Sequence, residues 1–135
     1  MNIGRFFAAT LGVWMVRVVL NGTFYIYIVG KQHDQIAFGH PGIYRIVIPA
    51  FIATDLIFAL AFAYLYARVG ATLGGGATAG MKLGLIVAVL SPIIGQLYQY
   101  YSFTFLPPGL VIKDMIFQTI AHAIEGAIAG LIYKT

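Results

Sequence analysis

Long runs of apolar residues, separated by short polar or glycine-rich breaks, make up most of the chain. Four of these runs cover residues 6–29, 43–67, 81–103 and 110–133. A transmembrane helix needs roughly 20 apolar residues to cross a hydrocarbon core of about 30 Å. Lipid offers no partner to a backbone N–H or C=O group, so each span has to be a helix. We therefore expect an all-α polytopic membrane protein, with four transmembrane helices in an up-down antiparallel bundle that forms one domain over residues 1–135.

The breaks between the runs indicate how the spans are connected. Residues 30–42 (GKQHDQIAFGHPG) are polar and carry glycine and proline near their ends, which is typical of a loop. His33 and His40 are then expected to be solvated. Residues 69–80 (VGATLGGGATAG) offer few side chains that could pack, which predicts a flexible connection. An even number of spans would place both termini on one side of the membrane.

Composition and charge narrow the possible environments and partners. The chain is 61% hydrophobic and 9% charged, which excludes a soluble domain, and it has no cysteine, which excludes disulfides and thiolate sites. Its eight basic residues are scattered singly, so the net charge of +4 indicates anionic lipid as a partner and no nucleic acid. Basic residues near the span ends favour cytoplasmic termini by a small excess. They are Arg5, Arg68, Lys82 and Lys134 on the side of the termini, against Lys31, Arg45 and Lys113 on the other.

Aromatic residues gather at both ends of the spans, as they do in the interfacial belts of membrane proteins. The outer belt is predicted to contain Tyr25, Tyr27, Tyr98, Tyr100, Tyr101 and Phe103, and the inner belt Phe6, Phe7, Tyr64, Tyr66 and Tyr133.

Ionisable residues within the spans are the candidate functional residues, because each costs about 3 kcal/mol or more to insert at the bilayer centre. Arg17, Asp55 and His122 each lie 12 residues from the predicted outer end of their span, which is a depth of about 18 Å. Glu125 lies one turn further in than His122. Three helices are therefore expected to bring polar groups to one level.

The last span carries a polar stripe that has to face protein or water. The stripe contains Asp114, Gln118, His122, Glu125 and Ala129, which helical spacing places on one face. Asn21 lies one turn outward of Arg17, and Gln96 on the third span reaches a similar level. We predict an intramembrane polar network of Arg17, Asn21, Asp55, Gln96, Gln118, His122 and Glu125.

Arg17 and Asp55 are the natural pair in this network, because each neutralises the other. Glu125 is then protonated, shares charge with His122, or joins Arg17 in a three-body network. His122-x-x-Glu125 resembles half of a di-iron motif, yet only Asp55 is left as a further ligand, so we expect no metal and no cofactor.

Proline and glycine positions predict the shape and packing of the helices. Pro92 and Pro49 lie inside predicted spans and are expected to bend them. Two small-residue spacings predict close helix packing or a contact between copies of the chain. They are Gly80-x-x-x-Gly84 and Gly126-x-x-x-Gly130.

The chain resembles small four-helix bacterial membrane proteins of uncharacterised function. The resemblance lies in FIATDLIFALAFAYLYA (residues 51–67), the following GGGATAG, the proline-bearing third span and the closing EGAIAGLIY. It covers most of the chain and implies a bacterial cytoplasmic (inner) membrane, with no catalytic residues to transfer.

Three functions remain open at the level of the sequence. The first is a non-catalytic accessory or assembly subunit of a larger membrane complex, since no loop is long enough for an active site. The alternative is a small homo-oligomeric transporter or channel for protons, cations or a small solute, using Asp55, His122 and Glu125. The third, with least support, is a lipid- or quinone-acting enzyme with Glu125 and His122 as acid and base.

Overall fold

Every regular element of the computed structural model is a helix over residues 1–43 and 45–134, which are the residues that the structure describes. Two of the elements, η1 and η2, are π-helical segments that interrupt otherwise α-helical spans. The elements in chain order are α1 (Ile3–Gly22), η1 (Thr23–Ile28), α2 (Gly30–Gly39), α3 (Ile48–Val69), α4 (Gly76–Ala88), η2 (Val89–Ile93), α5 (Ile94–Ser102) and α6 (Pro108–Tyr133).

Four helical stretches are long and apolar enough to cross a membrane: Ile3–Ile28, Ile48–Val69, Gly76–Ser102 and Pro108–Tyr133. The shortest has 22 residues and the longest 27. At about 1.5 Å per residue, each reaches across a hydrocarbon core of roughly 30 Å. The predicted all-α class with four spans is confirmed. Residues 44 and 135, which belong to the predicted second span and the predicted domain, lie outside the described residues.

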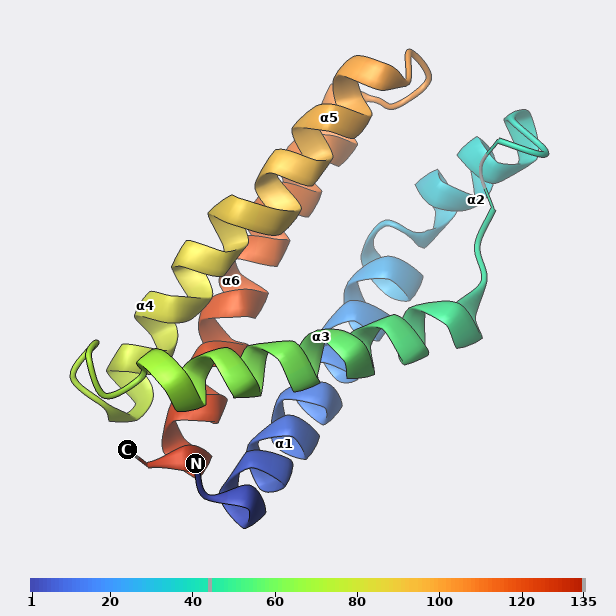
Figure 1. Cartoon of the computed structure of the whole chain (residues 1–135). Helices are drawn as coiled ribbons and strands as arrows, with labels where there is room; N and C mark the ends of the chain where they lie inside the picture. The colour runs from blue at the N-terminus through green and yellow to red at the C-terminus, as the bar shows by residue number, and fades with distance from the viewer. Residues whose placement is uncertain (44, 135) are drawn as a thin grey trace.

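The helices do not all run alongside one another. Figure 1 shows α6 lying along α4 and α5, whereas α3 crosses α1 and α6 obliquely. The up-down antiparallel order therefore stays a prediction. Both termini lie at the same end of the molecule (Figure 1), where Arg5 donates a hydrogen bond of 2.9 Å to the backbone oxygen of Lys134.

The predicted loop at residues 30–42 is wrong, because most of it forms the helix α2. The glycines of α2 stand at its two ends, and nothing between them breaks a helix. Ile36, only 8% exposed, anchors α2 in an apolar cluster that also contains Phe24, Leu106 and Leu110. Tertiary packing therefore decides the conformation of a segment whose composition is typical of a loop.

Two other predicted boundaries need correction. The second span begins at Ile48 and not at residue 43, so Pro49 falls in the first helical turn. A proline there removes no helical hydrogen bond, and the bend predicted at Pro49 is wrong. Helix α4 begins inside the predicted flexible connection, at Gly76, after a tight turn. Gly74, Gly75 and Gly76 have φ angles of +102°, +71° and +69°, which glycine adopts without strain.

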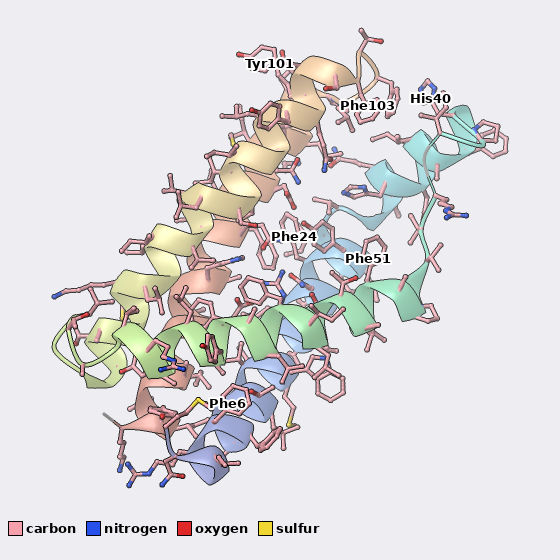
Figure 2. The ribbon with its side chains drawn as sticks, viewed as in Figure 1. Phe6, Phe24, His40, Phe51, Tyr101 and Phe103 are labelled. Atoms are coloured by element: carbon pink, nitrogen blue, oxygen red, sulfur yellow. The ribbon has the colours of Figure 1, made fainter. Side chains whose placement is uncertain are left out.

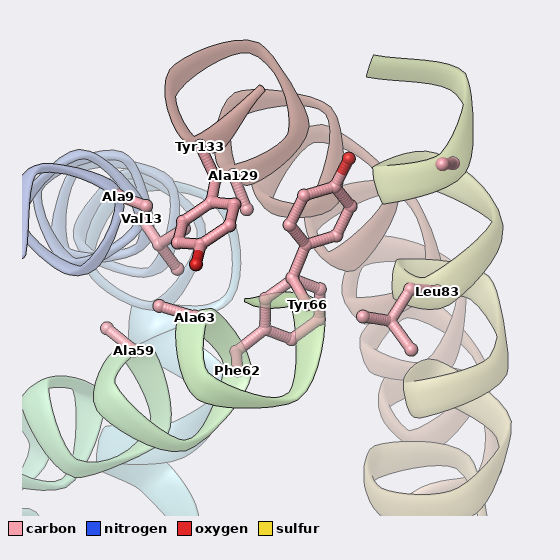
Figure 3. Close-up of a cluster of buried hydrophobic side chains, with 10 residues drawn as sticks. Ala9, Val13, Ala59, Phe62, Ala63, Tyr66, Leu83, Ala129 and Tyr133 are labelled. Atoms are coloured by element: carbon pink, nitrogen blue, oxygen red, sulfur yellow. The ribbon is translucent and has the colours of Figure 1, made fainter. Parts of the chain in front are cut away.

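Small apolar residues from α1, α3 and α6 hold together the half of the molecule that carries the termini. Ala9, Val13, Ala59, Ala63 and Ala129 are each at most 1% exposed and lie in one cluster. Figure 3 shows these side chains beside two tyrosines and Phe62. Small side chains let transmembrane helices approach closely, which is the main source of packing energy where lipid replaces water.

Two tyrosines in this cluster correct the predicted inner aromatic belt. Tyr66 is fully buried and donates a 3.0 Å hydrogen bond to the backbone oxygen of Gly76, and Tyr133 is 6% exposed. The hydroxyl of Tyr133 accepts a hydrogen bond from the backbone N–H of Asn2. Both rings therefore pack inside the protein and do not face the membrane interface.

The predicted glycine spacings face each other across the contact between α4 and α6. A Cβ atom on Gly80 would lie 1.8 Å from the backbone oxygen of Gly126, and one on Gly84 would lie 2.0 Å from that of His122. A Cβ on Gly130 would meet the backbone oxygen of Gly76 at 2.1 Å. The two backbones touch directly, so these glycines serve packing within the chain.

We predict that Gly126→Ala lowers the free energy of unfolding by about 2 kcal/mol or more, because its methyl group meets backbone that cannot give way. Gly95→Ala is the matched control, since a Cβ there meets nothing within 4 Å. The free energy of unfolding of this control is expected to rise by up to about 1 kcal/mol, because alanine lowers the entropy of the unfolded state. Unfolding in detergent micelles measures both, and equal stabilities would contradict the glycine contact.

Candidate functional site

An arginine on α1 holds carboxylates from two other spans. The Nε atom of Arg17 donates to Oδ1 of Asp55 on α3 at 2.8 Å. Its Nη1 atom donates to both carboxylate oxygens of Glu125 on α6, each at 3.1 Å. The side chain of Glu125 is fully buried, and that of Asp55 is 9% exposed. One guanidinium therefore joins three transmembrane helices.

Asn21 completes the surroundings of Asp55. Its side-chain nitrogen donates to both oxygens of Asp55, at 3.1 and 3.2 Å. Asn21 follows Arg17 by four residues, so both side chains leave α1 on the same face. We call Arg17, Asn21, Asp55, His122 and Glu125 the inner cluster.

Of the three arrangements left open for Glu125, the structure shows the three-body network with Arg17 and Asp55. The carboxylate of Glu125 lies 3.9 Å from Nδ1 of His122, which is a longer contact than the ones it makes with Arg17. The depth count that placed Asp55 level with Arg17 started from residue 43, five residues before α3 begins. The oblique crossing of α3, and not equal depth along parallel helices, brings Asp55 to Arg17.

His122 is buried beside this network with one ring nitrogen engaged. Its Nδ1 lies 2.8 Å from the backbone oxygen of Gln118. A carbonyl oxygen only accepts, so Nδ1 carries a proton in this contact. Nε2 has no hydrogen-bond partner among the described residues.

Phe58 is a member of the site that the sequence analysis missed. The Cζ atom of Arg17 lies 3.9 Å from the centroid of the Phe58 ring, and the ring of His122 approaches the same ring edge-on at 5.0 Å. A cation over an aromatic face is stabilised most when water is excluded. The available signal was the spacing of Phe58 three residues after Asp55, which places both on one face of α3.

A second group of polar side chains lies nearer the other end of α6. The hydroxyl of Tyr25 donates to Oδ1 of Asp114, and the amide of Gln96 donates to its Oδ2. The amide of Gln118 donates to the Tyr25 oxygen at 3.0 Å. We call Tyr25, Gln96, Asp114 and Gln118 the outer cluster. Gln96 therefore lies with Asp114 in the outer cluster and not beside Arg17.

Tyr25 was predicted to lie in the outer aromatic belt, and this is wrong. Its hydroxyl points into the protein, whereas Tyr27 nearby is 82% exposed. Residues 17 and 25 would differ by about 80° around a regular α-helix. The wider π-helical turn of η1 reduces this angle and turns Tyr25 toward α6.

The polar face predicted for α6 is buried along its whole length. Asp114, Gln118, His122 and Glu125 are 3%, 6%, 1% and 0% exposed, and Ala129 is fully buried. Gln118 links the two clusters, because its side chain contacts Tyr25 and its backbone oxygen contacts His122. Pro92, at which a bend of the third span was predicted, lies in the π-helical segment η2 of that span.

His33 and His40, the two histidines outside the spans, were predicted to be solvated, but each ring packs against an aromatic side chain. The ring of His33 on α2 lies 5.6 Å from that of Tyr25, edge to face. Burial lowers the pKa of His33, and the carboxylate of Asp34 partly opposes this shift. His40 stacks on Phe105 with ring centroids 4.2 Å apart. Figure 2 shows His40 at the far end of α2.

Neither polar cluster opens into the hollows on the outer surface. One hollow of about 290 Å³ is lined by apolar side chains of α1, from Met15 to Leu20, and another of about 220 Å³ by residues of α5, from Ile94 to Tyr101. Over residues 1–43 and 45–134, no group of three or more His, Asp and Glu side chains is placed to hold a metal ion.

Comparisons with protein-family models, with curated proteins and with solved structures found no match. The resemblance to small four-helix bacterial membrane proteins therefore stays an expectation.

We predict that Arg17→Ala lowers the free energy of unfolding by about 3–5 kcal/mol, because it leaves two carboxylates in the membrane without their cation. Adding Asp55→Asn and Glu125→Gln to Arg17→Ala removes both stranded charges and should recover at least half of that loss. Unfolding of the single and triple variants in the same detergent measures the difference. A triple variant no more stable than Arg17→Ala would show that the three groups do not act as one network.

Proposed function

We propose that the chain is a non-catalytic integral membrane protein that serves as an accessory or assembly subunit of a larger membrane complex. The observation that carries this proposal is the engagement of Arg17 with both Asp55 and Glu125. A guanidinium shared by two carboxylates fixes how α1, α3 and α6 cross, since any other arrangement leaves a charge without a partner. Such a network supports a defined shape, which is what a partner would recognise.

The shortness of two connections and the exposure of apolar helix faces support the same proposal. The connections that follow the second and third spans are short: six residues separate α3 from α4, and five separate α5 from α6. Partners would therefore meet the protein mainly through helix faces. Apolar side chains cover those faces, among them Ile57 at 68% and Leu90 at 67% exposed. These faces would contact membrane lipids and other subunits.

The proposed location is the bacterial cytoplasmic (inner) membrane, with both termini in the cytoplasm. The resemblance described above supports the choice of membrane. The small excess of basic residues at the ends that carry the termini supports the orientation, because short cytoplasmic segments are enriched in lysine and arginine.

Mild extraction of the tagged chain from its native membrane should co-purify other membrane proteins in a fixed ratio, measured by mass spectrometry. Arg17→Ala should lose these partners, because the helix crossing that presents the contact faces changes. Tyr27→Phe, an exposed position outside both clusters, is the matched control and should keep them. A parent chain that elutes alone as one monodisperse species would contradict the proposal.

A second candidate, a small homo-oligomeric transporter or channel for protons, cations or a small solute, has one observation in its favour. Three carboxylates lie inside the spans, and the inner cluster offers one guanidinium to two of them. The interior is therefore short of positive charge, which protons or cations would supply. Four helices enclose little volume, so a conducting pathway would require several copies. Asp55, His122 and Glu125 would line it.

For this second candidate, Glu125→Gln should abolish proton or cation flux into proteoliposomes, because it removes the buried carboxylate and keeps its shape. Asp34→Asn on α2 removes a carboxylate outside the spans and should leave flux unchanged. Flux is followed with a pH-sensitive dye or a radioactive cation. Equal flux in the parent and in Glu125→Gln, or none in the parent, would remove this candidate.

A further inference from the structure

We propose that the outer cluster is a binding site for a small alkali cation of the sodium type, with the Asp114 carboxylate as its charged ligand. The site differs from the inner cluster in its residues and in its charge balance. It does not depend on either proposed function, because binding at equilibrium requires neither a partner protein nor transport.

The first observation is that Asp114 is buried without a cation. The residue is 3% exposed, and its carboxylate contacts two neutral groups, the hydroxyl of Tyr25 and the amide of Gln96. The ion pairs of the described residues join Arg17 and His122 to other carboxylates and none involves Asp114. Lys113 is next in sequence, but its side chain is exposed on another face of α6. A negative charge held this way in hydrocarbon requires a counter-charge.

The second observation is an unpartnered oxygen atom in the same hydrogen-bonded cluster. Gln118 is 6% exposed, and its side-chain oxygen has no hydrogen-bond partner among the described residues. The nitrogen of the same amide donates to the hydroxyl of Tyr25, which itself contacts Asp114. The unpartnered oxygen therefore belongs to an amide that two hydrogen bonds, through the hydroxyl of Tyr25, link to the carboxylate. A proton on Asp114 would neutralise the charge but would leave this oxygen unsatisfied.

The chemistry of the available ligand atoms selects the kind of ion. The carboxylate of Asp114, the side-chain carbonyl of Gln118 and the hydroxyl of Tyr25 offer oxygen atoms. A 180° rotation of the Gln96 amide would replace its N–H₂ group with another oxygen. Oxygen atoms are the ligands of hard cations, whereas transition metals prefer sites with nitrogen or sulfur. A single carboxylate among neutral oxygens balances one positive charge. A monovalent alkali cation fits this set better than Mg²⁺ or Ca²⁺.

The backbone around the cluster is irregular on two of its three spans. Tyr25 lies in the π-helical segment η1, and Gln96 follows η2 by three residues. Segments of this kind occur frequently at functional sites, because the extra residue redirects side chains. Asp114 lies six residues after the start of α6, which is about 9 Å into the span. An ion would reach it from the end of the bundle that carries α2.

Equilibrium binding of radioactive sodium to the purified full chain in detergent tests the proposal, with choline chloride holding the ionic strength constant. The parent is expected to bind one sodium ion per chain in a saturable manner. Asp114→Asn should lower the affinity more than tenfold, because it removes the charged ligand. Gln118→Leu should also lower it at least tenfold, since it removes the open oxygen while Asp114 keeps its charge. Asp34→Asn on α2 is the control and should bind like the parent.

Gel filtration establishes which variants fold. If Asp114→Asn does not fold, the sodium affinity of Gln118→Leu tests the proposal. A parent chain without saturable sodium binding would overturn the proposal. A folded Asp114→Asn variant with parental affinity would overturn it as well. Proton uptake by the parent that sodium does not displace would show that Asp114 binds a proton only, and this too would overturn the sodium site. None of these outcomes bears on co-purification or on flux through Glu125.

Discussion

The ion pairs of Arg17 constrain the rest of the structure more than any other interaction. A guanidinium cannot lose its charge in a protein, so within the hydrocarbon it must find anions that the chain itself supplies. Asp55 and Glu125 supply them from two different helices. The crossing of α1, α3 and α6 therefore has few alternatives, because a rotation that separated one carboxylate would leave it buried and unpaired. The ring of Phe58 covers one face of the guanidinium.

The close contact between α4 and α6 complements this network with a different kind of interaction. Glycines at 80, 84, 126 and 130 bring two backbones together with no side chain between them. This contact is directed by shape, whereas the network is directed by charge. Because α6 takes part in both, it has one polar face toward α1 and one small-residue face toward α4. The other spans are arranged around it, as Figure 1 shows.

The two polar clusters share α6 but differ in what they leave unsatisfied. In the inner cluster, every carboxylate contacts the guanidinium, and the arrangement holds helices together. In the outer cluster, Asp114 contacts only neutral donors, and the Gln118 oxygen stays open. Paired charges fix the positions of helices, whereas a carboxylate without a cation, in a cluster that also holds an unpartnered oxygen, can bind a ligand. The same helix face can therefore be structural at one depth and functional at another.

The sequence alone determined the four spans, the charged residues within them and the buried face of α6, because apolar run length and helical spacing are properties of single helices. It did not determine that Tyr25 contacts Asp114, that Arg17 takes both Asp55 and Glu125, or that residues 30–39 form a helix. Only the tertiary structure decided these, since they depend on the rotation and crossing of helices relative to their neighbours. Spacing along one helix fixes which residues share a face, and packing between helices fixes what that face meets.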